Sequence, residues 1–304
     1  MATAFSENLT AEQQAQVLQL FQQFQHPSLQ KDLIALNTLK KVEKGGDVLR
    51  IELQLPFAWN TGVEQVKQQL SDALLKATDS KEIKWVVNYQ IATLKRANNQ
   101  PAVKGVKNII AVTSGKGGVG KSSVSVNLAL ALQAQGARVG ILDADIYGPS
   151  IPHMLGAPHQ RPTSPDNQHI TPIKAYGLSA NSIGFLMDED NATIWRGPMA
   201  SSALSQLLNE TLWDSLDYLV IDMPPGTGDI QLTLSQQIPV TGAVVVTTPQ
   251  DIALLDAVKG VSMFERVSVP VLGIVENMSM HICSNCGHHE AIFGTGGAEK
   301  MAQK

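Results

Sequence analysis

The stretch Gly115-Lys116-Gly117-Gly118-Val119-Gly120-Lys121-Ser122 decides the fold of this chain. It is preceded by a β-branched run, residues 108–113, that is typical of a buried strand. Residues 123–135 follow with apolar side chains at helical spacing, and Gly136 stands at the expected C-cap. A strand, a glycine-rich loop and a helix form the context in which a G-x-x-x-x-G-K-S/T motif binds phosphates. The sequence therefore predicts a P-loop that binds a nucleoside triphosphate.

Glycine, lysine and serine each have a separate task in such a loop. Glycines let backbone N–H groups crowd around phosphate oxygens, which a Cβ atom would obstruct, and the start of the following helix adds partial positive charge. Lys121 is expected to reach the β- and γ-phosphates of ATP, and the Ser122 hydroxyl is expected to hold Mg²⁺. The predicted nucleotide-contacting residues are Gly115, Lys116, Gly117, Gly118, Val119, Gly120, Lys121, Ser122 and Ser123.

The composition is that of an ordinary globular protein. Of the 304 residues, 43% are hydrophobic and 16% are charged, and the length suits two domains. A net charge of −4 argues against a general nucleic-acid-binding function. No apolar run approaches the roughly 20 residues of a membrane span, and the first twenty residues lack the features of a secretory signal. Two cysteines are too few for a disulfide framework, so we expect a cytoplasmic protein that binds neither membrane nor nucleic acid.

Residues 1–94 predict a small separate α/β domain. Thr10 and Gln13 have the spacing of a capping box, at the start of a helix whose apolar residues recur up to Phe24. The expected strands cover residues 39–42, 48–55 and 83–89, and a second helix is marked by apolar residues from 63 to 75. Residues 95–107 are polar and contain proline and glycine, which indicates a linker.

The remaining residues, 108–304, alternate short β-rich runs with helices. This alternation predicts a mostly parallel, doubly wound sheet, and together with the loop it gives an α/β P-loop NTPase fold. Ligands of such sheets bind outside the carboxyl ends of the strands. The expected strands cover residues 109–113, 138–143, 217–222, 242–248 and 271–276.

Carboxylates stand at the ends of two of these strands. Asp143 and Asp145 are two residues apart, so their side chains point toward one face. Beside a nucleotide, one would orient attacking water and the other would serve Mg²⁺, and a helix N-cap is the alternative role for either. Asp222 ends an apolar strand, as the Walker B motif requires, and is expected to meet Mg²⁺. Residues 223–229 suit a loop that changes shape with the γ-phosphate.

Further polar groups follow the fifth strand. Asn277 offers both a donor and an acceptor, which match an adenine edge, although a simple Asx-turn is the alternative. Cys283 and Cys286 bring two sulfurs together, whereas a tetrahedral iron or zinc site needs four ligands. Three interpretations compete: a redox dithiol, a cluster of four cysteines shared by two copies of the chain, and a zinc site within one chain that recruits His281, His288 or His289.

Lys116 adds a second cation to the loop, and at this residue the sequence resembles the deviant Walker A ATPases, the group of MinD, ParA and the nitrogenase iron protein. The resemblance implies that Lys116 reaches across a dimer interface to the partner's nucleotide and so couples ATP binding to dimerisation. A solvated loop lysine is the alternative. The resemblance also implies that Asp145 activates hydrolysis and that Asn277 recognises adenine. Lys116, Lys121 and Asp145 are therefore the predicted catalytic residues.

Five motifs together are similar to those of the Mrp/ApbC-type iron–sulfur cluster carriers. They are residues 115–122, 143–150, 195–199, 222–229 and the pair Cys283-x-x-Cys286. The resemblance spans about residues 108–304, and general deviant Walker A proteins lack the cysteine pair. It implies a homodimer that holds a labile [4Fe–4S] cluster between its subunits and passes the cluster to apo-proteins under the control of ATP. It places Trp195–Met199 near the dimer face, where a buried turn is the alternative.

Two departures from the family pattern change the expectations. Residues 1–94 resemble a MIP18-like (DUF59) domain, but many relatives have a cysteine where this chain has residues 55–59. The family normally continues past the position of Lys304 with another strand and helices. We therefore expect a truncated chain, with an uncovered sheet edge and weak or absent ATP hydrolysis.

Two other functions compete with cluster transfer. A positioning ATPase that acts on membrane or DNA would show a basic surface or a terminal amphipathic helix, and it would have no use for Cys283 and Cys286. A reductase like the nitrogenase iron protein draws its cysteines from two distant sites in the chain, whereas this pair lies three positions apart. A close and accessible cysteine pair favours a cluster that is transferred to another protein over a cluster that stays bound.

Overall fold

Two separate sheets organise the chain. The computed structural model describes residues 3–97, 99–186 and 197–303. Its backbone divides into two compact units, one formed by Met1–Ala92 with Ala134–Ala137 and the other by Thr93–Gln133 with Arg138–Lys304. Each unit has its own sheet and its own buried core.

The first unit packs two helices against a four-stranded sheet of order β1-β2-β3-β4. Its strands are β1 (Ala4–Phe5), β2 (Leu39–Gly45), β3 (Val48–Leu55) and β4 (Glu82–Tyr89), and its helices are α1 (Ala11–Gln23) and α2 (Asn60–Thr78). Strands β2 and β3 form an antiparallel hairpin, whereas β1 and β4 run parallel to their neighbours. Fully buried Val17 and Phe21 turn α1 toward this core.

The predicted capping box at the start of α1 is confirmed. The Thr10 hydroxyl accepts a hydrogen bond from the Gln13 backbone N–H at 3.2 Å, and the Gln13 side chain accepts one from the Thr10 N–H at 3.0 Å. These bonds satisfy two backbone donors that the first turn of a helix leaves without an intrahelical partner.

The second unit contains a seven-stranded sheet of order β11-β10-β5-β9-β6-β8-β7. All neighbouring pairs are parallel except β7 with β8. The strands are β5 (Val106–Ser114), β6 (Val139–Asp143), β7 (Ile173–Ala175), β8 (Leu178–Ser182), β9 (Leu216–Asp222), β10 (Gly242–Thr247) and β11 (Val271–Glu276). The small antiparallel pair β12 (His281–Ile282) and β13 (His289–Glu290) follows β11.

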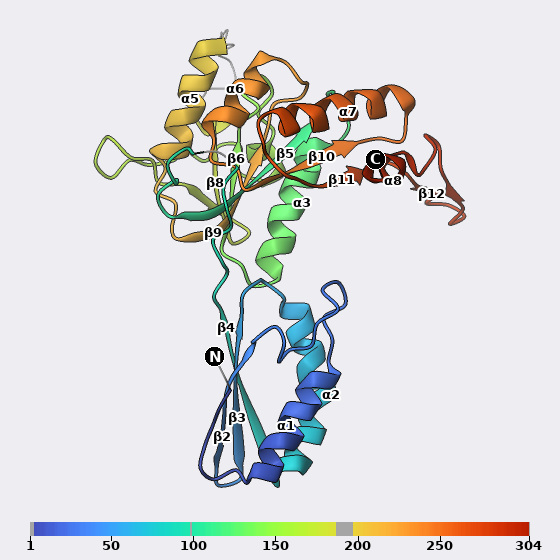
Figure 1. Cartoon of the computed structure of the whole chain (residues 1–304). Helices are drawn as coiled ribbons and strands as arrows, with labels where there is room; N and C mark the ends of the chain where they lie inside the picture. The colour runs from blue at the N-terminus through green and yellow to red at the C-terminus, as the bar shows by residue number, and fades with distance from the viewer. Residues whose placement is uncertain (1–2, 98, 187–196, 304) are drawn as a thin grey trace. The chain divides into compact units, whose positions relative to one another are not determined.

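Helices cover this sheet on both faces. Figure 1 shows α5, α6 and α7 on one side of the sheet and α3 on the other, as right-handed crossovers between parallel strands require. The helices are α3 (Lys121–Ala134), α4 (Ile151–Met154), α5 (Gly197–Asn209), α6 (Asp229–Gln237), α7 (Asp251–Arg266) and α8 (Gly297–Ala302), with a 3₁₀ turn at Ile183–Phe185. The predicted α/β fold, with a mostly parallel sheet after a smaller α/β unit, is confirmed.

Strands β7 and β8 were not predicted from the sequence. The sequence of β8, Leu-Ser-Ala-Asn-Ser, contains no β-branched or aromatic residue, yet all five residues are buried. β-Propensity mainly reflects how a side chain fits its sheet neighbours, and here buried hydrogen bonds act beside the apolar packing of Leu178 and Ala180. Asn181, for example, donates to the Thr211 hydroxyl at 2.7 Å.

Within the described residues, no helix combines the length and the apolar character that a membrane span needs.

Gly105 precedes β5 in a conformation that only glycine adopts easily. Its φ is +78°, and a Cβ atom would lie 2.1 Å from the Trp213 carbonyl oxygen. We predict that Gly105→Ala lowers the free energy of unfolding by about 2 kcal/mol or more, measured by urea denaturation. Gly260→Ala in α7 is the matched control, because a Cβ there meets no atom within 4 Å and the change stabilises a helix by about 0.5–1 kcal/mol. Equal stability of the two variants would contradict this assignment.

Candidate functional site

The predicted P-loop connects the interior strand β5 to α3. Gly118 and Gly120 have φ values of +81° and +84°, and a Cβ at Gly117 or Gly118 would meet no protein atom within 4 Å. The loop therefore presents bare backbone to a cavity of about 350 Å³, whose walls also include Lys121, Ser122 and Asp145. This is the open cradle that phosphate binding requires.

Lys121 holds the centre of the site. Its side chain is only 6% exposed, and its Nζ lies 2.8 Å from Asp222 Oδ1 and 3.8 Å from Asp145 Oδ2. A buried ammonium requires such counter-charges, because desolvation without them is very costly. Lys121 stands at the first position of α3, so the helix start fixes the lysine beside the strand ends.

Asp222 ends β9 and is fully buried. Its Oδ2 accepts a hydrogen bond from the Ser122 hydroxyl at 2.6 Å, and its Oδ1 accepts one from the Ser125 hydroxyl at 2.6 Å. With Lys121 as a third partner, the carboxylate has its acceptor sites satisfied by protein groups. Ser125 was missed in the sequence analysis. It lies four residues after Lys121, one helical turn further on the same face of α3.

The buried face of α3 explains why the sequence pattern did not point to Ser125. The apolar residues at helical spacing, such as Val124 and Leu128, are half-buried, whereas Ser125, Val126 and Ala129 are buried. Polar Ser125 gives no hydrophobic signal, and only its place beside Asp222 shows its use.

Asp143 pairs in register with Asp222 on the neighbouring strand. Its Oδ1 accepts from the Asp145 N–H at 3.1 Å, and its Oδ2 accepts from the Ile151 N–H and the Ser182 hydroxyl, both at 3.1 Å. Complete burial, together with the nearby charge of Asp222, raises the pKa of Asp143 to about 7. Asp143 therefore anchors the loop that leads to α4, and its role toward a nucleotide stays a prediction.

Asp145 occupies a different position from Asp143. Its carboxylate is 14% exposed and lies in the wall of the P-loop cavity. Burial raises the pKa of Asp145, while the charge of Lys121 acts in the opposite direction. Of the two aspartates on this loop, Asp145 is the one placed to meet a ligand or a water molecule in the cavity.

The side chains around the cavity fit a magnesium nucleotide. Mg²⁺ prefers hard oxygen ligands. The Ser122 hydroxyl lies in the cavity wall, and the Asp222 carboxylate lies 2.6 Å behind it. A triphosphate needs backbone donors and a lysine, which Gly117, Gly118 and Lys121 supply. A bound metal would supply charge neutralisation for the phosphates, and the protein groups would exchange their present mutual bonds for bonds to it.

Asn277 and Lys116 flank the loop. The Asn277 side-chain amide donates to the Val119 carbonyl at 2.9 Å, so it contacts the P-loop directly. Lys116 is half-buried, and no ion pair joins it to any other described residue. Adenine contact by Asn277 and the interface role of Lys116 stay predictions.

The cysteine pair lies on a segment that follows β11, here named the cysteine arm and defined as residues 277–296. Cys283 is half-buried and Cys286 is exposed. The Cys283 N–H donates to the His288 carbonyl, and the Gly287 N–H donates to the Cys283 carbonyl, both at 2.9 Å, which folds the pair into a tight turn. Backbone N–H groups of Cys286 and Asn285 lower the pKa of the Cys283 thiol, and a thiolate is the form that binds metals.

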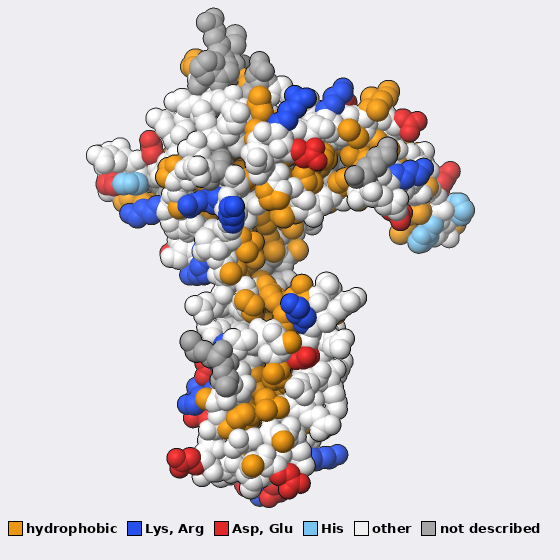
Figure 2. All heavy atoms as spheres, in the orientation of Figure 1, with side chains coloured by type: hydrophobic (Ala, Val, Ile, Leu, Met, Phe, Trp, Pro, Cys, Tyr) orange, Lys and Arg blue, Asp and Glu red, His pale blue; other side chains and the backbone are white. Residues whose placement is uncertain are grey.

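Figures 1 and 2 show the outer part of this arm: β12 lies at the far right of the second unit, where histidine side chains gather. In the part of the chain that the structure describes, no group of three or more His, Cys, Asp or Glu side chains is arranged to hold a metal ion. The single-chain zinc site with His281, His288 or His289 therefore lacks a ligand set in this arrangement.

The structure thus places Lys121, Ser122 and Asp145 in the wall of one cavity, with Asp222 buried behind Lys121 and Ser122, and it places the cysteine pair on a separate arm. Of the motifs named from the sequence, Trp195 and Arg196 lie outside the described residues. Gly197–Asn209 forms α5.

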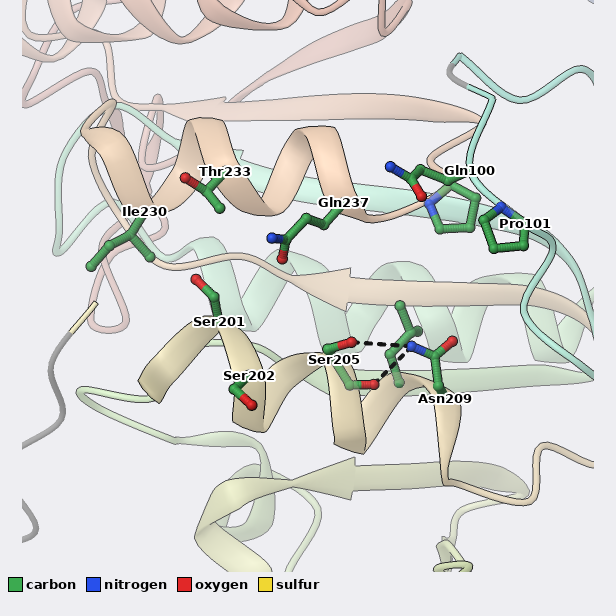
Figure 3. Close-up of a pocket in the computed structure, with 11 residues that line it drawn as sticks. Gln100, Pro101, Ser201, Ser202, Ser205, Asn209, Ile230, Thr233 and Gln237 are labelled. Atoms are coloured by element: carbon green, nitrogen blue, oxygen red, sulfur yellow. Dashed lines mark hydrogen bonds between the residues drawn. The ribbon is translucent and has the colours of Figure 1, made fainter. Parts of the chain in front are cut away.

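A larger cavity, of about 750 Å³, lies between α5 and α6 and contains none of the predicted site residues (Figure 3). Serine, threonine and amide side chains dominate its lining, and Ser205 with Asn209 is internally hydrogen-bonded. The lining residues that the structure describes carry no charge.

The parallel sheet, the glycine loop after its interior strand β5 and the Lys121–Asp222 pair define a P-loop NTPase. A family model described as ParA, NUBPL iron-transfer P-loop NTPase, matches residues 105–304. This match covers more than half of the chain, and the chain belongs to that family.

The relatives agree with this assignment. An iron–sulfur cluster carrier protein of Haemophilus influenzae is 91% identical over 304 residues, which are 100% of this chain and 82% of the relative. The iron–sulfur cluster carrier protein of Escherichia coli is 68% identical over 281 residues, 92% of this chain and 76% of its own. A nucleotide-binding protein from Archaeoglobus fulgidus, solved in complex with ADP and with cobalt found, is 41% identical with a TM-score of 0.58, covering 66% of this chain and 78% of that one.

The raised pKa of Asp143 predicts a pH-dependent stability. Its carboxyl ionises near 3.8 in the unfolded chain and at about 7 in the folded protein, so the folded state holds the proton between these values. The protonated Asp143 carboxyl therefore stabilises the folded state fully below pH 4, and this contribution to the unfolding free energy is lost as the pH rises through 7. Between these limits, the unfolding free energy of the wild type should fall relative to Asp143→Asn by up to about 1.4 kcal/mol per pH unit.

This difference is measured by urea denaturation of both proteins at several pH values. Asp214→Asn removes an exposed carboxylate of the same unit and serves as the control. If wild type and Asp143→Asn show parallel pH profiles, the buried proton is not there.

Proposed function

We propose that this protein is an ATP-dependent carrier that holds a [4Fe–4S] cluster across a homodimer and delivers it to apo-proteins. The observation that carries the proposal is the half-complete metal site of the cysteine arm. Cys283 and Cys286 are accessible and adjacent, and no third ligand stands beside them among the described residues. The iron–sulfur cluster carrier proteins of Haemophilus influenzae and Escherichia coli, to which the chain is closely similar, support the same cargo.

Two thiolates per chain explain why a second copy is needed. A [4Fe–4S] cluster takes four cysteine ligands, and two arms supply four. Cys283 is half-buried, and Cys286 and the residues around it are exposed, so a cluster bound between two arms is open to attack by the thiols of a recipient protein. Transfer then proceeds by exchange of protein thiolates for recipient thiolates, with no change in the charge of the cluster.

The nucleotide site supplies the control. In the proposed cycle ATP enters the P-loop cavity, Lys121 moves from Asp222 to the β- and γ-phosphates, and Ser122 with Asp222 holds Mg²⁺. Asp145, at the cavity wall, orients the attacking water. Lys116, without an ion pair to any described residue of its own chain, reaches the nucleotide of the second copy. The two free cysteines suit a reducing compartment such as the cytoplasm.

The first test concerns the cysteine pair. Anaerobic reconstitution with iron and sulfide should give the wild type a visible absorbance band and about two irons per chain, whereas Cys283→Ala/Cys286→Ala should give almost none. His288→Ala is the matched control within the same turn, and it should load like the wild type. Equal absorbance in the double variant would overturn the proposed carrier function. Loss of the absorbance band in His288→Ala would instead indicate that His288 is a metal ligand.

The second test concerns Lys116. Truncating one partner of a buried charge pair typically costs several kcal/mol of binding energy, so Lys116→Ala should weaken the dimer formed with a non-hydrolysable ATP analogue by at least about 30-fold. Sedimentation velocity with and without the analogue measures this change. Lys104→Ala, an exposed lysine of the same unit, should leave the dimer unchanged. A wild type that stays monomeric with bound analogue would contradict the proposal.

A further inference from the structure

A single carboxylate closes the base of the cysteine arm. Glu276 is the last residue of β11. Its Oε1 accepts a hydrogen bond from the Gly296 N–H at 2.9 Å, and its Oε2 accepts one from the Ala298 N–H at 2.7 Å. Gly296 is the last residue of the arm, so the two bonds join the end of the arm to its beginning. Hydrogen bonds to a charged acceptor are roughly twice as strong as neutral ones.

The next residue faces the other way, toward the nucleotide loop. Asn277 donates through its side chain to the Val119 carbonyl at 2.9 Å, and its backbone N–H donates to the Thr247 carbonyl at 2.8 Å. A Cβ on Gly120 would lie 2.3 Å from the Asn277 amide nitrogen, so the loop and this amide are in direct contact. Val119 and Gly120 belong to the same backbone that lines the phosphate cavity.

We propose that Glu276 and Asn277 are positioning residues that couple the P-loop to the cysteine arm. Asn277 holds the loop, Glu276 holds the base of the arm, and a single peptide bond joins them at the end of an edge strand. This coupling would let a bound nucleotide control the cysteine arm. Only the biological use of the coupling rests on the proposed carrier function. The contacts themselves belong to the nucleotide site and the arm.

The physical basis of the coupling is the weak packing of the arm. Residues 283–293 are exposed apart from Cys283, so the arm has no core of its own and its order depends on its base. A nucleotide that fixes the backbone at Val119 and Gly120 also fixes Asn277, and through Asn277 it fixes Glu276. Ordering at one site then lowers the entropic cost of ordering at the other, and the effect is reciprocal between nucleotide and arm.

Hydrogen exchange of the full chain tests this coupling with ADP as the only ligand. At saturating ADP, amides of residues 281–290 in the wild type should exchange more slowly by about fivefold or more. Glu276→Gln keeps the size of the side chain but replaces one acceptor oxygen with a donor, so two bonds to backbone N–H groups become one. In this variant the ADP-induced protection of the arm should be lost, while amides of the P-loop stay protected.

Two further variants sharpen the result. Glu290→Gln makes the same charge change on β13, away from the base, and should keep the full effect. Asn277→Leu removes the donor to Val119, and at an ADP concentration that saturates this variant the arm should again lose its protection. An unprotected arm in ADP-bound wild type, or equal protection in Glu276→Gln, overturns the proposal. Because no cluster is used, these outcomes are independent of whether the chain carries iron.

Discussion

The buried ion pair between Lys121 and Asp222 is the constraint around which the second unit is arranged. Its members come from the start of α3 and the end of β9, and their charged atoms lie 2.8 Å apart with almost no exposure. Separating them would leave an uncompensated charge in the protein interior, which costs several kcal/mol. The pair therefore holds the glycine loop against the carboxyl ends of the strands and keeps the cavity open for a ligand that can replace one of its members.

The two carboxylates on neighbouring strand ends illustrate how one fold separates chemical roles. Asp222 is surrounded by a lysine and two serine hydroxyls, whereas Asp143 binds only backbone N–H groups and Ser182. The field of Asp222 adds to burial in raising the pKa of Asp143, since two buried like charges cannot both be stabilised. Asp222 thus stays next to the lysine and the serine of the P-loop, and Asp143 secures the loop that carries Asp145.

The thiols of Cys283 and Cys286, which we propose as cluster ligands, lie outside this dense network. Their arm leaves the sheet at β11 and returns to it through the Glu276 carboxylate. An exposed and thinly packed segment suits a group that must both accept and release its cargo, because such segments open at low free-energy cost. The tight core of the P-loop and the loose arm are therefore complementary, and the Glu276–Asn277 dipeptide is the point where the two meet.

The sequence by itself determined the P-loop, the parallel sheet around it, the place of Asp222 at a strand end and the spacing of the cysteine pair, because each depends on local spacing or hydrophobic periodicity. It did not reveal β8, where three of the five buried residues are polar, or Ser125 and Glu276, whose partners lie 97 and 20 residues away. Likewise, Asp143 and Asp145 share one sequence motif, and only the tertiary structure separates an anchored carboxylate from one facing the cavity. Hydrogen bonds between distant residues leave no periodic trace in the sequence, so the folded chain alone decided which polar groups meet.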